Sequence, residues 1–425
     1  MEGRIEEWTK QMAQLAEFAK TQPHAAHAAF THGLTSQWTY ALRVSACIPK
    51  GALRPLEEVI CHQLIPNLTR QPTPNEVTRQ LLALPARLGG LGLVNPAAME
   101  HHSSKTLCEP LVRLILDQNG NVANAQHQQK LIKQRFHNQR RKEISAHAKE
   151  LIERLPADER KCAVAAQEKG VSSWLAALPL AQHGFSLTRG EFHDALALRY
   201  GWPIYGIPQT CACGQPFSVD HALICRCGGY IGYRHDQLRD LTANLLQEVC
   251  VNVAVEPQLR SLQGEELGRS ANTDDCARLD IRATGFWKGS QDAFFDLRVF
   301  YPFASSYQNS RLASVYKQHE AKKRSEYGRR VREIEGGSFT PLVFTTGGGT
   351  AGEATIFYKR LASLLADKRN ESYSTLMGWL RCVLSFSLLR SSIRCVRGTR
   401  KRTNNIPTDN ITIAALDSRL PNNSS

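Results

Sequence analysis

Apolar residues recur every three or four positions in the first part of the chain, which is the spacing of helices that bury one face. This pattern predicts helices over residues 2–20, 24–31 and 53–64, and then one helix after another from about residue 108 to residue 199. The first helix is indicated by Ile5, Trp8, Met12, Leu15 and Phe18. An all-helical first part of the chain is therefore expected, with the third helix ending before Pro66.

The pattern changes at residues 200–208, where two prolines and a glycine indicate a boundary. Short strand-like segments and glycines follow to about residue 349, as expected of a mixed α and β domain. Helices are predicted again over residues 353–396, where Arg381 interrupts the most apolar run and favours a core helix over a membrane span. After Arg400 the chain is polar and is expected to be disordered.

Two glycine-rich segments are predicted to be turns. Residues 88–93 place three glycines among leucines, which is typical of a tight turn packed against apolar neighbours. Residues 347–349 follow a short strand over residues 342–344 and lack the Gly-Lys-Ser/Thr of a phosphate-binding loop.

Two of the strand-like segments carry one aspartate each. In residues 277–281 the alternation turns Leu279 and Ile281 toward the core and Asp280 to the opposite face. In residues 293–299 it buries Phe295, Leu297 and Val299, so that Asp296 and Arg298 share the other face.

Composition adds a preference for a polyanionic partner. The chain has 425 residues with 53 Lys and Arg against 39 Asp and Glu, a net charge of +14, and neutralising phosphates with such side chains releases counterions. One basic run is either a solvated helix face or a nucleic-acid contact. It consists of Lys130, Lys133, Arg135, Arg140, Arg141 and Lys142. No secretory signal is expected at the first residues.

Four of the twelve cysteines crowd one short stretch. Cys211, Cys213, His221 and Cys225 offer three sulfurs and an imidazole that can close around a tetrahedral zinc, and the turn between them contains glycine and proline. The alternative is a group of buried thiols. Cys227 is an alternative to Cys225, and His235 is either an outer group or a fifth candidate ligand. Four protein ligands leave no open position, so a structural site is expected.

Paired carboxylates on adjacent strands are what a metal-dependent nuclease needs. They hold Mg²⁺ or Mn²⁺, which polarises the phosphate and lowers the pKa of an attacking water, while a cation steadies the developing charge. Asp280 and Asp296 followed by Arg298 fit this pattern, although by themselves they are more typical of surface ion pairs. A predicted helix over residues 314–333 strengthens the case because Lys323 and Tyr327 lie one turn apart on it, with His319 and Lys322 nearby.

These motifs together resemble the later part of non-LTR retrotransposon polyproteins of the class whose endonuclease is related to type II restriction enzymes, the PD-(D/E)XK fold. The resemblance covers nearly the whole chain up to about residue 400. It is carried by Leu88-Gly89-Gly90-Leu91-Gly92, the Cys and His array, Arg234-His235 with Arg239-Asp240, Arg278-Leu279-Asp280-Ile281, Phe295-Asp296-Leu297-Arg298-Val299 and His319-Glu320 with Lys323 and Tyr327.

The resemblance implies a mixed fold with six segments. It begins with a helical, thumb-like region over residues 1–105, after a polymerase palm that the chain lacks, and a helical linker over residues 106–205. A zinc knuckle over residues 206–235 precedes a restriction-endonuclease-like α/β core over residues 236–350. C-terminal helices over residues 351–400 and a disordered tail over residues 401–425 complete it.

The resemblance also implies roles for individual residues. Asp280 and Asp296 bind Mg²⁺ or Mn²⁺, Lys323 on the following helix is the working cation, and Tyr327 shapes the pocket. Arg298 stands where the family has the lysine of the DxK motif, and arginine cannot act as a general base, so its role is a supporting one. Leu279 replaces the family's proline. Nucleic-acid contacts are expected from Arg135, Arg140, Arg141, Lys142, Arg234 and His235.

The expected function is nicking of a DNA target in a nuclear location, with element RNA as a further partner and no membrane. The only adjacent aspartates, Asp274 and Asp275, lack the hydrophobic strands of a polymerase palm, so a reverse transcriptase would act in trans. Glu256, in the strand-like residues 253–256, is an additional candidate acidic ligand. The alternative function is a non-catalytic, nucleic-acid-binding remnant of a retrotransposon protein, or a product without a selected function.

Overall fold

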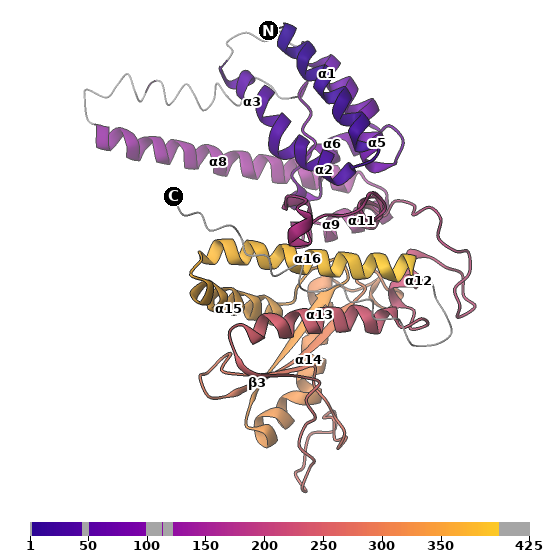
Figure 1. Cartoon of the computed structure of the whole chain (residues 1–425), viewed down its shortest axis with the longest axis vertical. Helices are drawn as coiled ribbons and strands as arrows, with labels where there is room; N and C mark the ends of the chain where they lie inside the picture. Colours follow the sequence, from indigo (N-terminus) through magenta and orange to yellow (C-terminus); the bar gives the residue numbers. More distant parts are fainter. Residues whose placement is uncertain (1, 45–50, 99–112, 114–121, 399–425) are drawn as a thin grey trace. The chain divides into compact units, whose positions relative to one another are not determined.

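The computed structural model describes residues 2–44, 51–98, 113 and 122–398. The chain forms two compact units (Figure 1). The first comprises Met1–Gln167 and Leu178–Trp202, and the second comprises Glu168–Ala177 and Pro203–Ser425. The division near residue 202 lies next to the boundary that the prolines predicted. The expected tail over residues 401–425 lies outside the described residues.

The first unit is helical throughout its described part, as the apolar periodicity predicted. Its helices are α1 (Glu2–Ala19), α2 (Pro23–Ala28), η1 (Ala29–Leu34), α3 (Thr35–Val44), α4 (Arg54–Val59), η2 (Ile60–Leu64), α5 (Ile65–Thr69), α6 (Glu76–Ala83), η3 (Ala86–Leu88), α8 (Val122–Glu153), α9 (Ala157–Ala165), η4 (Ala181–His183) and α11 (Arg189–Tyr200). Helix α1 buries Ile5, Trp8, Met12 and Leu15, whereas Phe18 is 48% exposed.

The predicted end of the third helix at Pro66 was wrong. The chain continues as a helix from α4 through η2 to α5, with Pro66 in the first turn of α5. The π-helical segment η2 explains this, because its wider turn hydrogen-bonds the Ile65 N–H to the Ile60 carbonyl before the proline is reached. Pro66, which has no N–H to donate, then occupies a position where that loss costs little.

The turn predicted at residues 88–93 is present. Gly89 adopts φ +94°, a left-handed conformation that favours glycine. At Gly90 a Cβ atom would lie 1.9 Å from the Leu84 carbonyl oxygen, so a side chain cannot be accommodated there. The buried Arg199 of α11 donates to the Gly90 and Ala86 carbonyls and fastens this turn within the helical unit.

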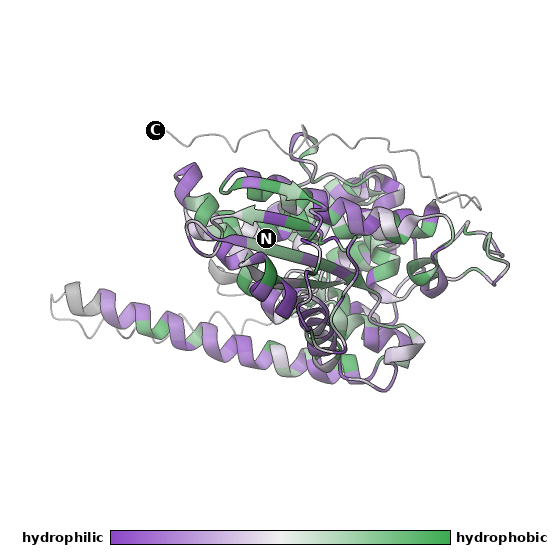
Figure 2. Cartoon of the chain, turned by 90° about the horizontal axis from the view of Figure 1, so that it is seen from below, coloured by the Kyte–Doolittle hydropathy of each residue, from purple (hydrophilic) through white to green (hydrophobic). Residues whose placement is uncertain are grey.

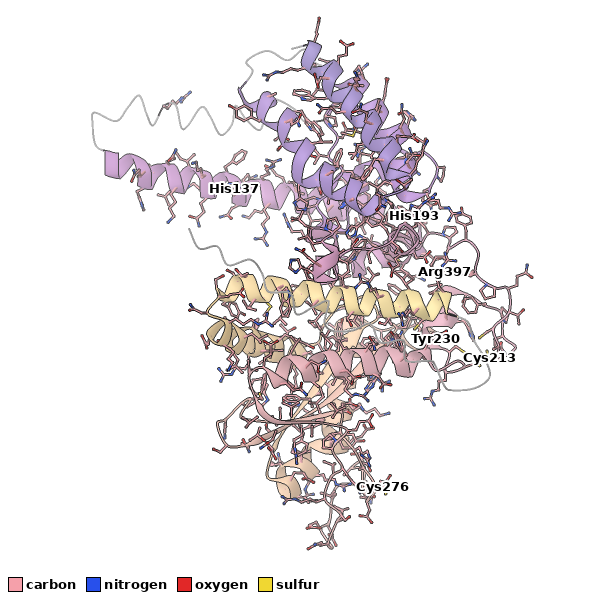
Figure 3. All side chains as sticks on the ribbon, in the orientation of Figure 1. His137, His193, Cys213, Tyr230, Cys276 and Arg397 are labelled. Atoms are coloured by element: carbon pink, nitrogen blue, oxygen red, sulfur yellow. The ribbon has the colours of Figure 1, made fainter. Side chains whose placement is uncertain are left out.

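Helix α8 is polar and exposed over most of its length. Only its last turns are buried, through Ala148, Leu151 and Ile152. The remainder extends away from the helices of its unit as a largely hydrophilic rod, and His137 marks that segment (Figures 2 and 3). Helices that are polar on all sides either bridge domains through solvent or depend on side-chain pairs four residues apart.

The second unit is built on a four-stranded mixed sheet, which confirms the predicted α and β character. The strands are β1 (Val251–Val255), β2 (Ile281–Thr284), β3 (Asp292–Phe300) and β4 (Ser338–Thr345), in the order β1-β2-β3-β4. Strands β1 and β2 pair antiparallel, as do β2 and β3, whereas β3 and β4 are parallel. A parallel pair needs a crossover connection, and α14 (Leu312–Lys323) with η6 (Arg324–Gly328) and η7 (Val331–Glu335) provides it.

Helices cover both faces of this sheet. On one face, Phe295 of β3 packs against Phe357 of α15 (Gly352–Arg369), and α13 (Tyr230–Gln247) also packs on the sheet, while α16 (Tyr373–Arg397) packs against α13 and α15 (Figure 1). On the other face, Phe300 and Val343 pack against Val315 of α14. The shorter helices of this unit are α10 (Ser173–Ala176), α12 (Val219–Ile224) and η5 (Ser305–Tyr307). No helix in the described part of the chain is long and apolar enough to cross a membrane.

Candidate functional site

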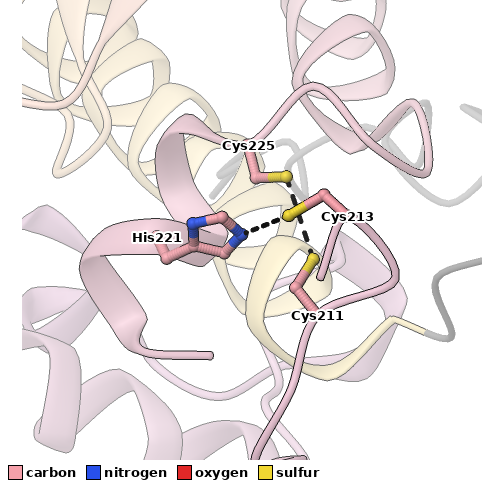
Figure 4. A group of neighbouring side chains, drawn as sticks. All are labelled: Cys211, Cys213, His221 and Cys225. Atoms are coloured by element: carbon pink, nitrogen blue, oxygen red, sulfur yellow. Dashed lines mark hydrogen bonds between the residues drawn. The ribbon is translucent and has the colours of Figure 1, made fainter. Parts of the chain in front are cut away.

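The four predicted zinc ligands lie together around one point (Figure 4). Their ligand atoms are all within 4.8 Å of one another. The Cys211 and Cys225 sulfurs are 3.8 Å apart, and the Cys213 sulfur is 3.3 Å from Nε2 of His221. Tetrahedral zinc with Zn–S bonds near 2.3 Å sets two sulfur ligands about 3.8 Å apart, so the donor set fits the ion.

Local backbone structure brings these ligands together. Gly214 adopts φ +86° in the tight turn between Cys213 and Gln215, and the Thr210 to Pro216 bridge closes a small hairpin below it. Ser218 caps α12, which carries His221. Cys225 follows the last residue of that helix, and its N–H donates to the His221 carbonyl.

The electrostatics of the cluster also suit a cation. Burial opposes ionisation of the Cys211 thiol, but hydrogen bonds from the Cys213 backbone and from neighbouring side chains outweigh it and lower its pKa to about 6. Burial raises the pKa of Cys225 to about 11, and the neighbouring Cys211 adds to the rise. The Cys227 N–H, which donates to the Cys225 sulfur, opposes it but is outweighed. The sulfurs therefore cannot all ionise without a positive partner. Cys227 and His235, the alternative ligands, are outside the cluster.

The short segment that carries the Cys and His cluster is hydrogen-bonded to other parts of the second unit. Arg234 of α13 is 2% exposed and donates to the Leu223 carbonyl of α12 through both terminal nitrogens, at 3.3 Å each. Tyr301, just after β3, donates to the Asp220 carboxylate at the start of α12. Arg234 was expected to contact nucleic acid. Its burial gives it a structural role instead, so it is not part of the interface proposed below.

The two predicted aspartates lie next to each other, Asp280 directly before β2 and Asp296 within β3. Ile281 pairs with Phe295 in the antiparallel register of β2 and β3, which places Asp280 beside Asp296. Leu279 and Ile281 are buried, as the alternation predicted. For β3 the prediction was only partly correct. Asp296 is only 5% exposed, because α14 covers the face that was expected to meet solvent, and Val299, which was expected to be buried, is half-buried.

Lys323, at the end of α14, lies directly over Asp296. Its ammonium nitrogen is 2.6 Å from Oδ2 of Asp296, a contact with the distance of an ion pair but without the angles of a directed hydrogen bond. Burial raises the pKa of Asp296 to about 6 against the opposing charge of Lys323, and the neighbouring Asp280 adds to the rise. Burial works against the charge on Lys323, but Asp296 outweighs it and raises the lysine pKa.

Asp280 is held by donors on two elements. His235 of α13 places Nε2 3.2 Å from Oδ2 of Asp280, and the Leu297 N–H donates to the same oxygen. Burial favours the protonated acid, but His235, the Leu297 N–H and Lys323 together lower the pKa of Asp280. Burial alone would lower the pKa of His235, yet Asp280 and Asp236 raise it to about 9. The predicted nucleic-acid contact His235 therefore lies at the carboxylate site.

The other predicted site residues fall around this pair. As its spacing on the predicted helix suggested, Tyr327 lies near Lys323, with its ring 5.7 Å from the lysine nitrogen. Its hydroxyl also accepts a hydrogen bond from Asn272 at 3.0 Å. Arg298 has no carboxylate partner among the described residues, and its buried Nε has no acceptor there. Glu256 lies at the end of β1 next to Asp280, where its N–H donates to the Asp280 carbonyl, and its half-exposed carboxylate pairs with Arg239.

The basic run lies on α8, in the first unit. Arg135, Arg140, Arg141 and Lys142 are all exposed and have no ion-pair partner in the described ranges. They do not form one helix face, because consecutive positions on a helix differ by about 100°. The charges surround the exposed rod.

Comparison with models of protein families gives no match, and comparison of the sequence with curated proteins gives no significant match.

Proposed function

We propose that this chain is a retroelement-derived, metal-dependent endonuclease that nicks DNA at the Asp280 and Asp296 site. The observation that carries the proposal is the convergence of three elements. The residue before β2 and the middle of β3 each present one aspartate, and the crossover helix places the Lys323 ammonium on the second of them. This is the set of charges that hydrolysis of a phosphodiester requires.

The chain's own groups suit a hard divalent cation. Each aspartate has one oxygen, Oδ2, engaged by protein donors or by Lys323, and Oδ1 of each has no donor among the described residues. Two carboxylate oxygens are what Mg²⁺ commonly takes from a protein, with water and substrate phosphate filling the other positions. When bound, the ion would polarise the phosphate and lower the pKa of a bound water.

Lys323 and Arg298 supply the remaining charge. Lys323 pairs with Asp296 in the absence of substrate, and it would lie within reach of a phosphate held by a metal ion at the same carboxylate. Its role is to stabilise the charge that develops on the phosphate oxygens. Arg298 lies two residues beyond Asp296 on the same strand face, and a cation without a carboxylate partner attracts a second phosphate of the backbone.

The remaining features support binding to a nucleic acid. The zinc centre has a structural role, and the basic residues of α8 contact phosphates without reading sequence. DNA is the proposed substrate. Element RNA is a further proposed partner, and a separate reverse transcriptase would supply any polymerase step.

A non-catalytic nucleic-acid-binding protein is the second candidate. The ion pair between Lys323 and Asp296 favours it, because this pair satisfies the buried carboxylate without a metal. In such a protein the basic residues of α8 would still bind nucleic acid.

An assay on supercoiled plasmid separates the two candidates. Purified full-length protein should convert the plasmid to the nicked form with Mg²⁺ or Mn²⁺. Asp280→Asn and Asp296→Asn should abolish nicking while leaving gel-shift affinity unchanged, since each variant keeps side-chain shape and removes one ligand charge. Wild-type protein that binds DNA with no more nicking than these variants would support the non-catalytic candidate.

A further inference from the structure

The two oxygens of the Asp280 carboxylate have different surroundings. Oδ2 accepts hydrogen bonds from Nε2 of His235 and from the Leu297 N–H, whereas Oδ1 has no donor in the described part of the chain. An aspartate side chain otherwise has a broad torsion about its last bond, so either oxygen can face a ligand. Two donors on one oxygen remove that freedom.

His235 is itself held on its other side. Its Nδ1 lies 3.3 Å from Oδ1 of Asp236, and Arg239, one turn further along α13, lies 3.1 Å from the same oxygen. Arg239 also pairs with Asp240 at 2.8 Å and with Glu256.

A backbone hydrogen bond links Glu256, the last residue in this series of contacts, to Asp280, the first. The Glu256 N–H donates to the Asp280 carbonyl at 2.9 Å. The imidazole is therefore part of a closed ring of polar contacts that joins α13, the end of β1 and the residue before β2. Its exposed fraction of 30% shows that solvent reaches only part of the side chain.

We infer that His235 is the positioning residue of this site, which fixes the Asp280 carboxylate so that Oδ1 alone is presented to a divalent cation. The inference rests on the proposed function of the aspartate pair. Outer groups that orient a ligating carboxylate are commonly worth about 10-fold to 100-fold in metal affinity. His235 was expected at nucleic acid, and no sequence spacing indicates its contact with a residue 45 positions away.

The test measures Mn²⁺ binding to the full-length, zinc-loaded protein by electron paramagnetic resonance, without DNA and without turnover. His235→Leu removes the donor, and His235→Gln retains an amide nitrogen at a similar reach. His62→Leu, at an exposed histidine of the helical unit, is the matched control. Wild type, His235→Gln and His62→Leu should bind Mn²⁺ with similar affinity, while His235→Leu should bind about tenfold more weakly or worse.

Nicking assays then locate the defect. If His235 acts by positioning a ligand, high Mn²⁺ should restore nicking by His235→Leu toward the wild-type rate. A rate that stays low at saturating metal, or Leu and Gln variants that bind Mn²⁺ equally, would overturn the inference. Unchanged Mn²⁺ binding by His235→Leu would also overturn the inference. Wild-type protein that binds no Mn²⁺, or binds it equally with Asp280→Asn and Asp296→Asn, would overturn the proposed function together with the inference.

Discussion

The Lys323 ammonium lies 2.6 Å from Oδ2 of Asp296, although 27 positions of sequence separate the two residues. The crossover between two parallel strands makes this contact, because α14 leaves the end of β3 and returns across the face that carries Asp296. A π-helical segment begins at the next residue, Arg324, and such segments are common at functional sites. The fold thus delivers a cation to a buried carboxylate that would otherwise be costly to ionise.

This relationship predicts a large difference between two cations. Lys323→Ala should reduce the nicking rate by about a hundredfold to a thousandfold, as does removal of a principal electrostatic interaction in other enzymes, because Lys323 is the cation that pairs with Asp296. Arg298→Ala should reduce it only about tenfold, since its role is to hold a neighbouring phosphate. Single-turnover nicking at saturating metal measures both, and an equal loss in the two variants would contradict the assignment of Lys323 as the working cation.

Hydrophobic periodicity was sufficient to predict most helices and the mixed character of the second unit. It failed at Pro66, where a π-helical turn admits proline into a continuing helix. It also failed on one face of β3, where alternation alone suggested solvent and α14 covers Asp296. Both failures have a tertiary or backbone cause that a local pattern does not contain.

The site residues that the sequence predicted are likewise those set by local spacing, and those it missed depend on contacts between distant elements. The zinc ligands were predicted because they lie within fifteen residues, where local spacing limits the geometry. The aspartate pair was predicted from strand character. The surroundings of Asp280 were not, because His235 reaches it from α13 and Arg239 connects to Glu256 through contacts between distant elements. For Arg234 the motif suggested a contact with nucleic acid, but the side chain is buried and bonds a carbonyl of α12.

Zinc removal should destabilise the second unit. Wild-type protein purified without chelator should contain one zinc per chain, and Cys213→Ser should contain less. The proposed zinc would hold α12 through His221 and Cys225, and Arg234 bonds a carbonyl of α12, so without the metal, hydrogen exchange should accelerate in α12 and in the first turns of α13. The control is Cys276→Ser, at an exposed cysteine on a loop far from Cys213 in the same unit (Figure 3).

Zinc content by mass spectrometry and peptide-level hydrogen exchange provide the measurements. Equal zinc in Cys213→Ser and Cys276→Ser would exclude the proposed ligand set.

Arg330 should be a large contributor to stability. It is fully buried and donates to the carbonyls of Asn272, Asp274 and Arg260, which lie in the connection between β1 and β2. Arg330→Met leaves three carbonyls without a donor, and we expect a loss of about 3 kcal/mol in the free energy of unfolding. Changing the neighbouring exposed Arg329, which pairs with Glu333 one turn away, to Met should lower the free energy of unfolding by about 0.5 kcal/mol or less.

Denaturant unfolding measures these two values. An Arg330→Met variant as stable as Arg329→Met would show that water satisfies the carbonyls.

The exposed charges of α8 should determine how binding depends on salt. Replacing Arg135, Arg140, Arg141 and Lys142 by Gln should weaken binding to any DNA sequence to a similar extent, because phosphate contacts carry no sequence information. The slope of log K against log salt should fall by about 0.9 for each phosphate that the variant no longer neutralises. The control has the same charge change elsewhere on the helical unit, at Arg4, Lys10, Lys20 and Arg87, which are exposed.

Fluorescence anisotropy over a range of salt concentrations measures both slopes. Identical slopes for the two quadruple variants would remove α8 from the nucleic-acid interface.

The helical unit should lose stability in mild acid through His27. This side chain is 2% exposed, and its Nε2 hydrogen-bonds the Leu91 carbonyl at 2.7 Å in the glycine turn. Burial lowers the pKa of His27 to about 4, against the hydrogen bond to Leu91, which favours the charged ring. The unfolded chain, with a histidine pKa near 6.5, binds the proton first as pH falls. Stability is therefore fully present above about pH 6.5 and declines toward pH 4, by up to about 3 kcal/mol over that window.

His27→Gln tests this because glutamine keeps an amide donor for Leu91 and does not titrate. Its free energy of local unfolding, from hydrogen exchange of α1 and α2 amides in the full chain, should be lower than that of wild type at pH 7.5 because the ring is lost. It should also decline less between pH 7 and pH 4.5. His62→Gln, at an exposed position of the same unit, should retain the wild-type pH dependence. If wild type and His27→Gln lose stability in parallel over that interval, the neutral, buried state of His27 is not what limits the acid stability of the unit.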